Sequence, residues 1–346
     1  MQTGASTPID QHPVRRSVRT AAGLVIAAAF LWLAFGQVDW AGVASVASNA
    51  TAGPIVLGLV ALAGGFFIRI VRWWTMLRAF EPELRLGACV RPFLLSLAVN
   101  NTMPLRAGDV VRAVGFRATL RSPRMRVVGT LLIERVLDLF VLVALFFIGW
   151  FAIPHGVIPR PFITAAGVLG AGALAGLLVL VLAPATLRAL TDRIASSRRF
   201  AAASWTPRAR DAAHHLFDTF SLVQSPTRAL SLLGLSLLAW MLEGAMYACV
   251  AWALHIGGSP VAPWFAAATG TLATMIPSSP GYVGTFDYFA ILGMTAFGAH
   301  RAASAAFAMV VHLMLWLPVT LVGAAFLVAP GASQLVRRPA RQRSAA

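Results

Sequence analysis

Six apolar segments of this 346-residue chain are long enough, with their flanks, to cross a lipid bilayer as helices. A crossing takes about 20 predominantly apolar residues. Charged residues make up 12% of the chain, whereas ordinary soluble domains carry about 25%. The sequence therefore predicts an all-α integral membrane protein, a single polytopic helical bundle over residues 1–346. The predicted full spans are 21–35, 54–70, 127–151, 161–182, 229–255 and 303–328.

The arginines predict the topology, because basic residues gather in the cytoplasmic loops of membrane proteins. All 28 basic residues are arginine, and 25 of them fall in four segments that we expect on the cytoplasmic side. This distribution explains the net charge of +16 without a nucleic-acid partner. We expect a bacterial cytoplasmic (inner) membrane protein with both termini inside. The four segments are the tail 1–20, residues 69–126, the loop 184–228 and the tail 330–346.

Two further apolar segments are too short to cross the membrane and are broken by polar residues. Residues 89–126 have arginine-rich flanks on both sides of a break near Asn100, so they predict a re-entrant hairpin from the cytoplasm. Residues 262–301 break after Ile276, and their flanks predict a second hairpin that enters from outside. With the six spans, the two hairpins give eight membrane segments.

The two breaks resemble each other. Aligning Pro104 with Pro277 places Gly108 on Gly281, and an acid follows each glycine, Asp109 in the first break and Asp287 in the second. Broken segments in corresponding positions, entering from opposite faces, indicate an inverted repeat with a site near the membrane midplane. Backbone N–H groups freed at such breaks can bind a phosphate or carboxylate.

Several charged residues fall inside or beside predicted spans, where ionised side chains are costly unless they are paired. Glu134, Arg135 and Asp138 share one helix face, which fits either a local ion pair or part of a functional site. Glu243 must be either paired or protonated, and Arg135 or another intramembrane arginine is the candidate partner. Two arginines three residues apart beside tryptophans read either as an interfacial anchor or as a group that attracts lipid headgroups: Arg69 and Arg72.

These motifs together resemble the transmembrane, flippase-like domain of lysylphosphatidylglycerol synthases, in the form of a stand-alone member without the soluble aminoacyl-transferase domain. The matching stretches are 69–73, 100–112 with its Pro-x-Arg-x-Gly-Asp core, 134–138 and 276–287. The chain departs from the family pattern in carrying Asp109 and Asp287 where glutamate is commoner. The resemblance implies movement of a phospholipid, glycolipid or isoprenoid lipid across the bilayer, and stand-alone relatives make a hopanoid cargo an option.

We therefore expect a lipid translocase that is not an enzyme and holds no cofactor or metal. Membrane lipids are its expected partners, and a homo-oligomer or a lipid-biosynthesis partner is left open. Two alternatives remain: a membrane-embedded lipid-modifying transferase (aminoacyl or glycosyl), with Glu134 and Asp138 as acid and base, and a non-catalytic accessory subunit of a lipid pathway. Besides Arg69 and Arg72, the expected substrate-binding residues are Asn100, Asn101, Arg106, Asp109, Arg112, Glu134, Arg135, Asp138, Glu243, Ser278, Ser279, Gly281, Tyr282 and Asp287.

Overall fold

The structure is a computed structural model, and the part described below comprises residues 25, 28–36, 38–103, 106–153, 160–182, 184–197, 205–276 and 279–328. Its regular elements are all helices, as predicted. After a helix at Ala28–Phe35, they are α2 (Trp40–Ser48), α3 (Ala52–Arg78), α4 (Gly87–Thr102), α5 (Ala107–Gly115), α6 (Arg117–Leu120), α7 (Arg124–Phe151), α8 (Arg160–Leu182), α9 (Pro184–Ala195), α10 (Thr206–Phe220), η2 (Ser221–Val223), α11 (Pro226–Ala253), α12 (Ala262–Ala273), η3 (Pro280–Tyr282), α13 (Thr285–Thr295) and α14 (Arg301–Val328).

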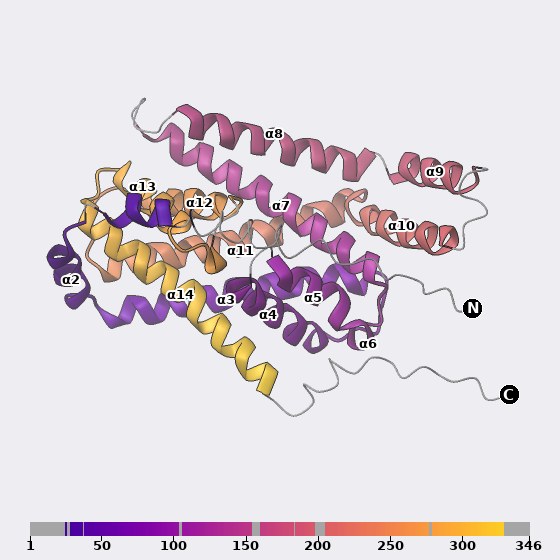
Figure 1. Cartoon of the computed structure of the whole chain (residues 1–346), viewed down its shortest axis with the longest axis horizontal. Coiled ribbons are helices and arrows are strands. Elements are labelled where there is room, and N and C mark those ends of the chain that lie inside the picture. Colours follow the sequence, from indigo (N-terminus) through magenta and orange to yellow (C-terminus); the bar gives the residue numbers. More distant parts are fainter. Residues whose placement is uncertain are drawn as a thin grey trace, which may run out of the picture.

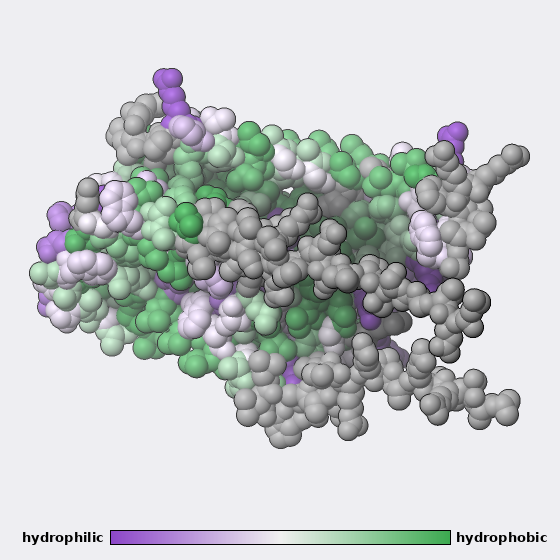
Figure 2. Space-filling view, viewed as in Figure 1, coloured by the Kyte–Doolittle hydropathy of each residue, from purple (hydrophilic) through white to green (hydrophobic). Residues whose placement is uncertain are grey.

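Four of these helices, α3, α8, α11 and α14, are long and apolar enough to cross a membrane, which confirms the membrane architecture. A fifth is added if Ala28–Phe35 and Trp40–Ser48, which meet at 76°, form one bent span. Helix α7 has 28 residues and is long enough, but Glu134, Arg135 and Asp138 interrupt its apolar sequence. In Figure 2, hydrophobic side chains dominate the middle of the visible face and hydrophilic ones lie mainly toward its two ends.

Two regions between the predicted spans contain helices. Residues 37–51 lie between two predicted spans and contain α2, and the Asp39 carboxylate caps the start of this helix by accepting from the N–H of Ala41 at 3.1 Å. The predicted cytoplasmic loop 184–228 holds α9, α10 and η2. An ion pair between Arg210 and Asp192, at 2.6 Å, joins α9 to α10.

The long helices run between two ends of the molecule (Figure 1). The arginine-rich elements α6, α9 and α10 lie at one end, and α2 with the α12–α13 pair lies at the other. Helices α4 and α12 approach the middle from these opposite ends, and the chain turns back in each case as α5 and α13. The breaks after α4 and α12 therefore meet inside the bundle.

At one point α4 and α5 pack so closely that only glycine fits. A Cβ on Gly108 of α5 would overlap the carbonyl oxygen of Ser96 in α4. The backbone N–H of Gly108 instead donates to the Asn100 side-chain oxygen at 2.8 Å. This contact holds the start of α5 against the end of α4, and so fixes the acid and arginine that follow Gly108.

Helix α8 is the least embedded of the four apolar helices. In its apolar window 11% of the residues are buried, against 33–39% in the other three. It packs mainly on α7 and runs along one side of the bundle (Figure 1). An element attached through one neighbour can move with little disturbance to the rest of the fold.

Candidate functional site

A polar cavity of about 390 Å³ lies where the two breaks meet. Five arginines and four carboxylates line it, together with apolar side chains such as Phe66 and Leu142. The charged lining residues are Arg69, Arg72, Arg106, Arg112, Arg135, Asp109, Glu134, Asp138 and Glu243.

Helix α3 supplies two of these arginines to carboxylates on other helices. The Arg69 guanidinium lies 2.7 Å from the Glu243 carboxylate of α11. Arg72 donates to both carboxylate oxygens of Asp138, at 2.6 and 3.2 Å, and also to the Ser236 hydroxyl at 2.6 Å. Arg72 is 1% exposed, so its charge depends on this two-point contact. These pairs tie α3 to α7 and α11 around the cavity.

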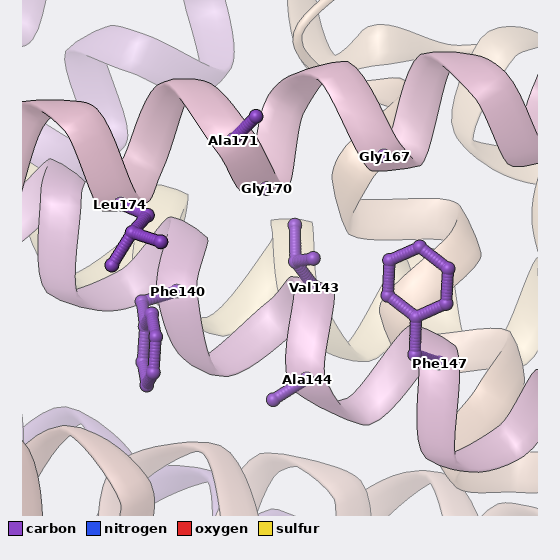
Figure 3. A pocket seen from close by; sticks show the side chains of 8 residues that line it. All are labelled: Phe140, Val143, Ala144, Phe147, Gly167, Gly170, Ala171 and Leu174. Carbon is purple, nitrogen blue, oxygen red and sulfur yellow. The ribbon is translucent and has the colours of Figure 1, made fainter.

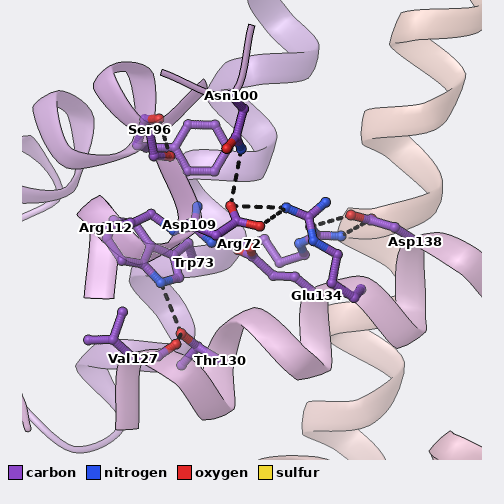
Figure 4. Close-up of polar contacts among 12 residues, drawn as sticks. Arg72, Trp73, Ser96, Asn100, Asp109, Arg112, Val127, Thr130, Glu134 and Asp138 are labelled. Carbon is purple, nitrogen blue, oxygen red and sulfur yellow. Dashed lines mark hydrogen bonds and ion pairs between the residues drawn. The ribbon is translucent and has the colours of Figure 1, made fainter. Parts of the chain in front are cut away.

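The first hairpin makes two more ion pairs with α7. Arg112 of α5 is paired with Glu134, and its guanidinium also lies over the ring of Trp73, 4.4 Å from the centroid. Arg135 donates to both carboxylate oxygens of Asp109, at 2.9 and 3.2 Å. Figure 4 shows Asp109, Asp138 and the arginines around them converging from separate helices. Each of the four lining carboxylates thus has its own arginine.

These contacts correct two readings of the sequence. The local ion pair considered within α7 is not formed, since Glu134, Arg135 and Asp138 each pair with another helix. Arg69 and Arg72 do not lie on the surface as an interfacial anchor does; they are 8% and 1% exposed. A guanidinium in a tightly packed bundle reaches the nearest carboxylate in space, which need not be the nearest in sequence.

Arg106 is the fifth arginine, and among the described residues no carboxylate forms an ion pair with it. Its Nε donates to the hydroxyl oxygen of Tyr282 at 3.3 Å, which joins the first break to the second. Both residues have a left-handed backbone, with φ of 52° and 59°. Non-glycine residues in this conformation are strained and are held there by their surroundings, a feature common at functional sites.

The remaining expected site residues lie outside the cavity lining or bind the protein itself. Asn100 accepts from Gly108 and donates to Asp109 at 3.2 Å, so its amide is used within the hairpin (Figure 4). Asn101 lines the cavity and donates to the hydroxyl of Thr320 in α14. The Ser279 hydroxyl donates to the Val283 carbonyl oxygen in its own turn. Ser278, with Pro277 and Pro104, falls outside the described residues.

The match between the two breaks holds for the acids and fails for the glycines. Asp109 and Asp287 are each the third residue of the second helix of their pair. Gly108 lies inside α5, whereas Gly281 lies in the turn before α13 with φ of 71°. Asp287 is 4% exposed and lies outside the cavity lining, bonded to the Gly284 N–H and to His312.

Sequence reasoning missed part of the α11 face that carries Glu243. Trp240 donates to the Asp138 carboxylate at 3.2 Å, and Arg69 lies 4.7 Å from the centroid of its ring. Ser236, Trp240, Glu243 and the buried Tyr247 are spaced by three or four residues, so they share one helix face. That spacing could have identified them. In the part of the chain that the structure describes, no three His, Cys, Asp or Glu side chains are grouped as a metal site.

The sequence matches a family model, the lysylphosphatidylglycerol synthase TM region, over residues 20–323. The chain belongs to this family. The match covers most of the chain and confirms the resemblance inferred from the motifs. It makes the protein a membrane protein whose function concerns lipids.

A curated relative is the protein named Glycosyltransferase AglD of Haloferax volcanii, 27% identical over 340 residues. The alignment covers 90% of this chain and 54% of the relative, so the chain spans about half the length of the curated relative it matches. The expectation that the protein is not an enzyme is contradicted, because this relative is named for an enzymatic activity. The apolar composition of the chain gave no sign of an enzymatic activity.

Proposed function

We propose that this chain moves a lipid across the membrane, with the lipid headgroup in the polar cavity and the tails in the bilayer. The observation that carries the proposal is the charge of the cavity, where five arginines face four carboxylates. Arg106, at the meeting point of the two breaks, forms no ion pair with a carboxylate of the described residues. An anionic headgroup, such as a phosphodiester, supplies the missing charge and can accept several hydrogen bonds from a guanidinium.

The buried ion pairs support a binding role. Replacing a buried ion pair by apolar residues often leaves stability unchanged or improves it, so four pairs around one cavity are poorly explained by stability alone. Four polar atoms of this network are buried with no hydrogen-bond partner among the described residues: Arg69 Nη1, Arg72 Nε, Arg112 Nε and Glu134 Oε1. Unsatisfied buried groups of this kind can bond a ligand or water.

The size of the cavity favours a headgroup over a whole lipid. Pockets that enclose a small molecule occupy about 300–1,000 Å³, and this cavity, at about 390 Å³, falls in that range, which suits a headgroup. A second, apolar hollow of about 360 Å³ lies between α7 and α8 (Figure 3). The tail is proposed to lie there, since α7 and α8 also line the polar cavity through Leu139, Leu142, Gly172 and Ala173.

The proposed topology places six spans and the two broken helix pairs in a bacterial inner membrane. The end with α6, α9 and α10 is assigned to the cytoplasm, because basic residues are retained there. In this arrangement α4–α5 and α12–α13 enter from opposite faces as an inverted repeat. The cavity then lies between the two faces, where an alternating-access movement can expose it to either side.

Purified protein in vesicles tests the proposal. The vesicles contain a fluorescent analogue of an anionic lipid, phosphatidylglycerol, or of a zwitterionic one, phosphatidylcholine, and a membrane-impermeant reductant reports transbilayer movement. We expect the protein to accelerate the anionic analogue more, and Arg106→Gln to remove most of that acceleration. Arg124→Gln is the matched control, since Arg124 is an exposed residue at the start of α7 and its replacement changes the net charge equally.

Two outcomes would overturn the proposal. One is that each analogue crosses the membrane at the same rate with and without the protein. The other is equal loss of activity in Arg106→Gln and Arg124→Gln, which points to net charge and not to the cavity.

A second candidate function is a part in glycosyl transfer to a membrane lipid, favoured by the name of the Haloferax volcanii relative. In this candidate function the acid and base are Glu134 and Asp138, two of the cavity carboxylates. Both are bonded to arginines. The test is mass spectrometry of lipids from membranes that express the chain and receive nucleotide sugars. A sugar-modified lipid that disappears with Glu134→Gln supports this candidate, and an unchanged lipid profile contradicts it.

A further inference from the structure

Asp287 differs from the four cavity carboxylates in the cation it binds. Those four are paired with arginines, whose charge is permanent. Asp287 lies 2.8 Å from Nδ1 of His312 in α14, and in the described part of the chain no arginine forms an ion pair with it. Histidine is the side chain whose charge changes near neutral pH, so among the described residues this pair combines a buried carboxylate with a titratable cation.

The hydrogen bonds of His312 fix how many protons the pair holds. Its Nε2 lies 3.0 Å from the carbonyl oxygen of Gly281, and a carbonyl can only accept, so Nε2 carries a proton. The contact between Nδ1 and the Asp287 carboxylate needs one more proton, on either atom. The pair therefore holds two protons and has no net charge in this conformation.

Loss of one proton changes this contact from attraction to repulsion. A neutral imidazole that keeps its proton on Nε2 turns the lone pair of Nδ1 toward an ionised carboxylate. The pair also gains a net negative charge in a buried site, which is unfavourable without a counter-ion. The contact between Asp287 and His312 should then break.

The pair holds both ends of the turn that carries Tyr282. His312 bonds the carbonyl oxygen of Gly281, and the second carboxylate oxygen of Asp287 accepts from the Gly284 N–H at 2.8 Å. Between these points Tyr282 has a strained left-handed backbone, with φ of 59°. The hydroxyl of Tyr282 is the group that accepts from Arg106 of the first break. Release of the turn therefore removes the contact between the two breaks.

Few charged or titratable groups face the pair from the elements packed around it. The ring of Phe286 packs edge-on against His312, with centroids 5.1 Å apart. Helix α11 contributes Tyr247, which is close enough for the charge of Asp287 to act on it. Glu243 of the same helix is bonded to Arg69. The segments of α2 and α12 contain no titratable side chain, and the arginine of α4, Arg91, is bonded to Phe326 at the far end of α14.

We propose that Asp287 and His312 form a proton-binding site, and that loss of its proton releases the Gly281–Gly284 turn from α14 and separates the two breaks. The step moves one proton from the pair to water and breaks no covalent bond. The inference rests on the proposed function only where it assigns the proton a role in driving lipid movement. In that role the proton is the ion whose binding and release at this site are coupled to lipid movement.

Two substitutions should have opposite effects. In Asp287→Asn the amide can donate to Nδ1 while its oxygen accepts from Gly284, so the variant imitates the protonated pair. In His312→Gln the amide can donate to Gly281, but its oxygen then faces the Asp287 carboxylate, so the variant imitates the deprotonated pair. A purely structural role predicts that both variants loosen the turn.

The opening of the turn is measured by thiol labelling. Thr285, next to Gly284, has an exposed fraction of 0%, so Thr285→Cys in a Cys89→Ala, Cys249→Ala background reacts only when the turn opens. Between about pH 5 and about pH 9, spanning the histidine range, the labelling rate should rise at least about tenfold with pH. Asp287→Asn should stay slow and His312→Gln fast at every pH. A flat profile in the parent, or fast labelling in both variants, overturns the inference.

The proton itself is detected by ¹⁵N nuclear magnetic resonance of histidine-labelled protein in nanodiscs, with His312 assigned from His312→Gln. We expect a pH-dependent loss of one proton at Nδ1 that is absent in Asp287→Asn. No titration, or the same titration in Asp287→Asn, contradicts the inference. Both readouts are independent of lipid movement: a parent protein that moves no lipid refutes the translocase proposal alone, whereas a flat labelling profile refutes the proton site alone.

Discussion

Arg106 donates a hydrogen bond to Tyr282 at 3.3 Å, and these two residues come from the two broken segments of the chain, 176 positions apart. Each has a left-handed backbone conformation, which residues other than glycine rarely adopt. The contact brings to the edge of the cavity an arginine that forms no ion pair with a carboxylate in the described part of the chain, whereas the other four lining arginines are paired. It connects the charge of the cavity to the conformation of both breaks.

Tyr282→Phe should loosen the contact between the breaks and keep the aromatic ring. A hydrogen bond to a charged group contributes about 1.5–3 kcal/mol, so the thiol of Thr285→Cys should react at least about tenfold faster at low pH. Tyr288→Phe is the control, because Tyr288 packs against Phe289 and Arg106 donates to Tyr282 instead. Equal labelling in Tyr282→Phe and the parent would show that the hydrogen bond does not hold the breaks together.

Gly108→Ala should destabilise the fold, because the new Cβ overlaps the Ser96 carbonyl oxygen. Overpacking of this kind costs about 1–3 kcal/mol, which thermal unfolding in detergent can detect. Gly87→Ala is the control in α4, since nothing lies within 4 Å of its Cβ. A Gly108→Ala protein as stable as Gly87→Ala contradicts the close packing of α4 on α5.

Variants of the Arg69–Glu243 ion pair should distinguish a role in stability from a role in lipid movement. Removing one member of a buried ion pair costs about 3–5 kcal/mol, so Glu243→Gln should lower the unfolding temperature clearly. The double variant Arg69→Met, Glu243→Leu should recover most of that stability, because it leaves no charge unpaired. If the pair binds the headgroup, the double variant still moves no lipid. Full transport by the double variant would assign the pair a structural role.

Filling the hollow between α7 and α8 should slow lipid movement. Ala171 lines the hollow and is exposed, so Ala171→Phe fills the space proposed for a tail without burying a polar group. Val168→Phe adds a ring on α8 at a residue outside the lining, where the side chain is 66% exposed. The vesicle assay should show a slower rate in Ala171→Phe alone, and equal rates in the two variants contradict the proposed tail site.

The sequence predicted the helices better than their contacts. Apolar length and arginine clustering were enough for the helical membrane architecture, because both follow directly from solvation by lipid and from charge. The ion-pair partners were harder to predict, because an ion pair between helices depends on packing that no local sequence pattern contains. Arg135 has an acid three residues away, yet it pairs with Asp109 on another helix.

His312 shows a second limit. A single histidine in an apolar helix has no local signal that separates a packed residue from a functional one. Its role follows only from the carboxylate and the carbonyl that face its two ring nitrogens. Conversely, the helix face of Ser236, Trp240 and Glu243 was available from spacing alone.

The central claim, that a lipid headgroup enters the cavity while its tail stays outside, is tested most directly by photolabelling. The chain in nanodiscs receives phosphatidylglycerol with a diazirine either on the headgroup or at the end of a tail, and labelled peptides are identified after proteolysis. The account predicts headgroup labelling of α5 and η3, near Arg106 and Tyr282, and tail labelling of α7 and α8 near Phe140 and Ala171. Headgroup labels confined to the arginine-rich end, in α9 and α10, would contradict it.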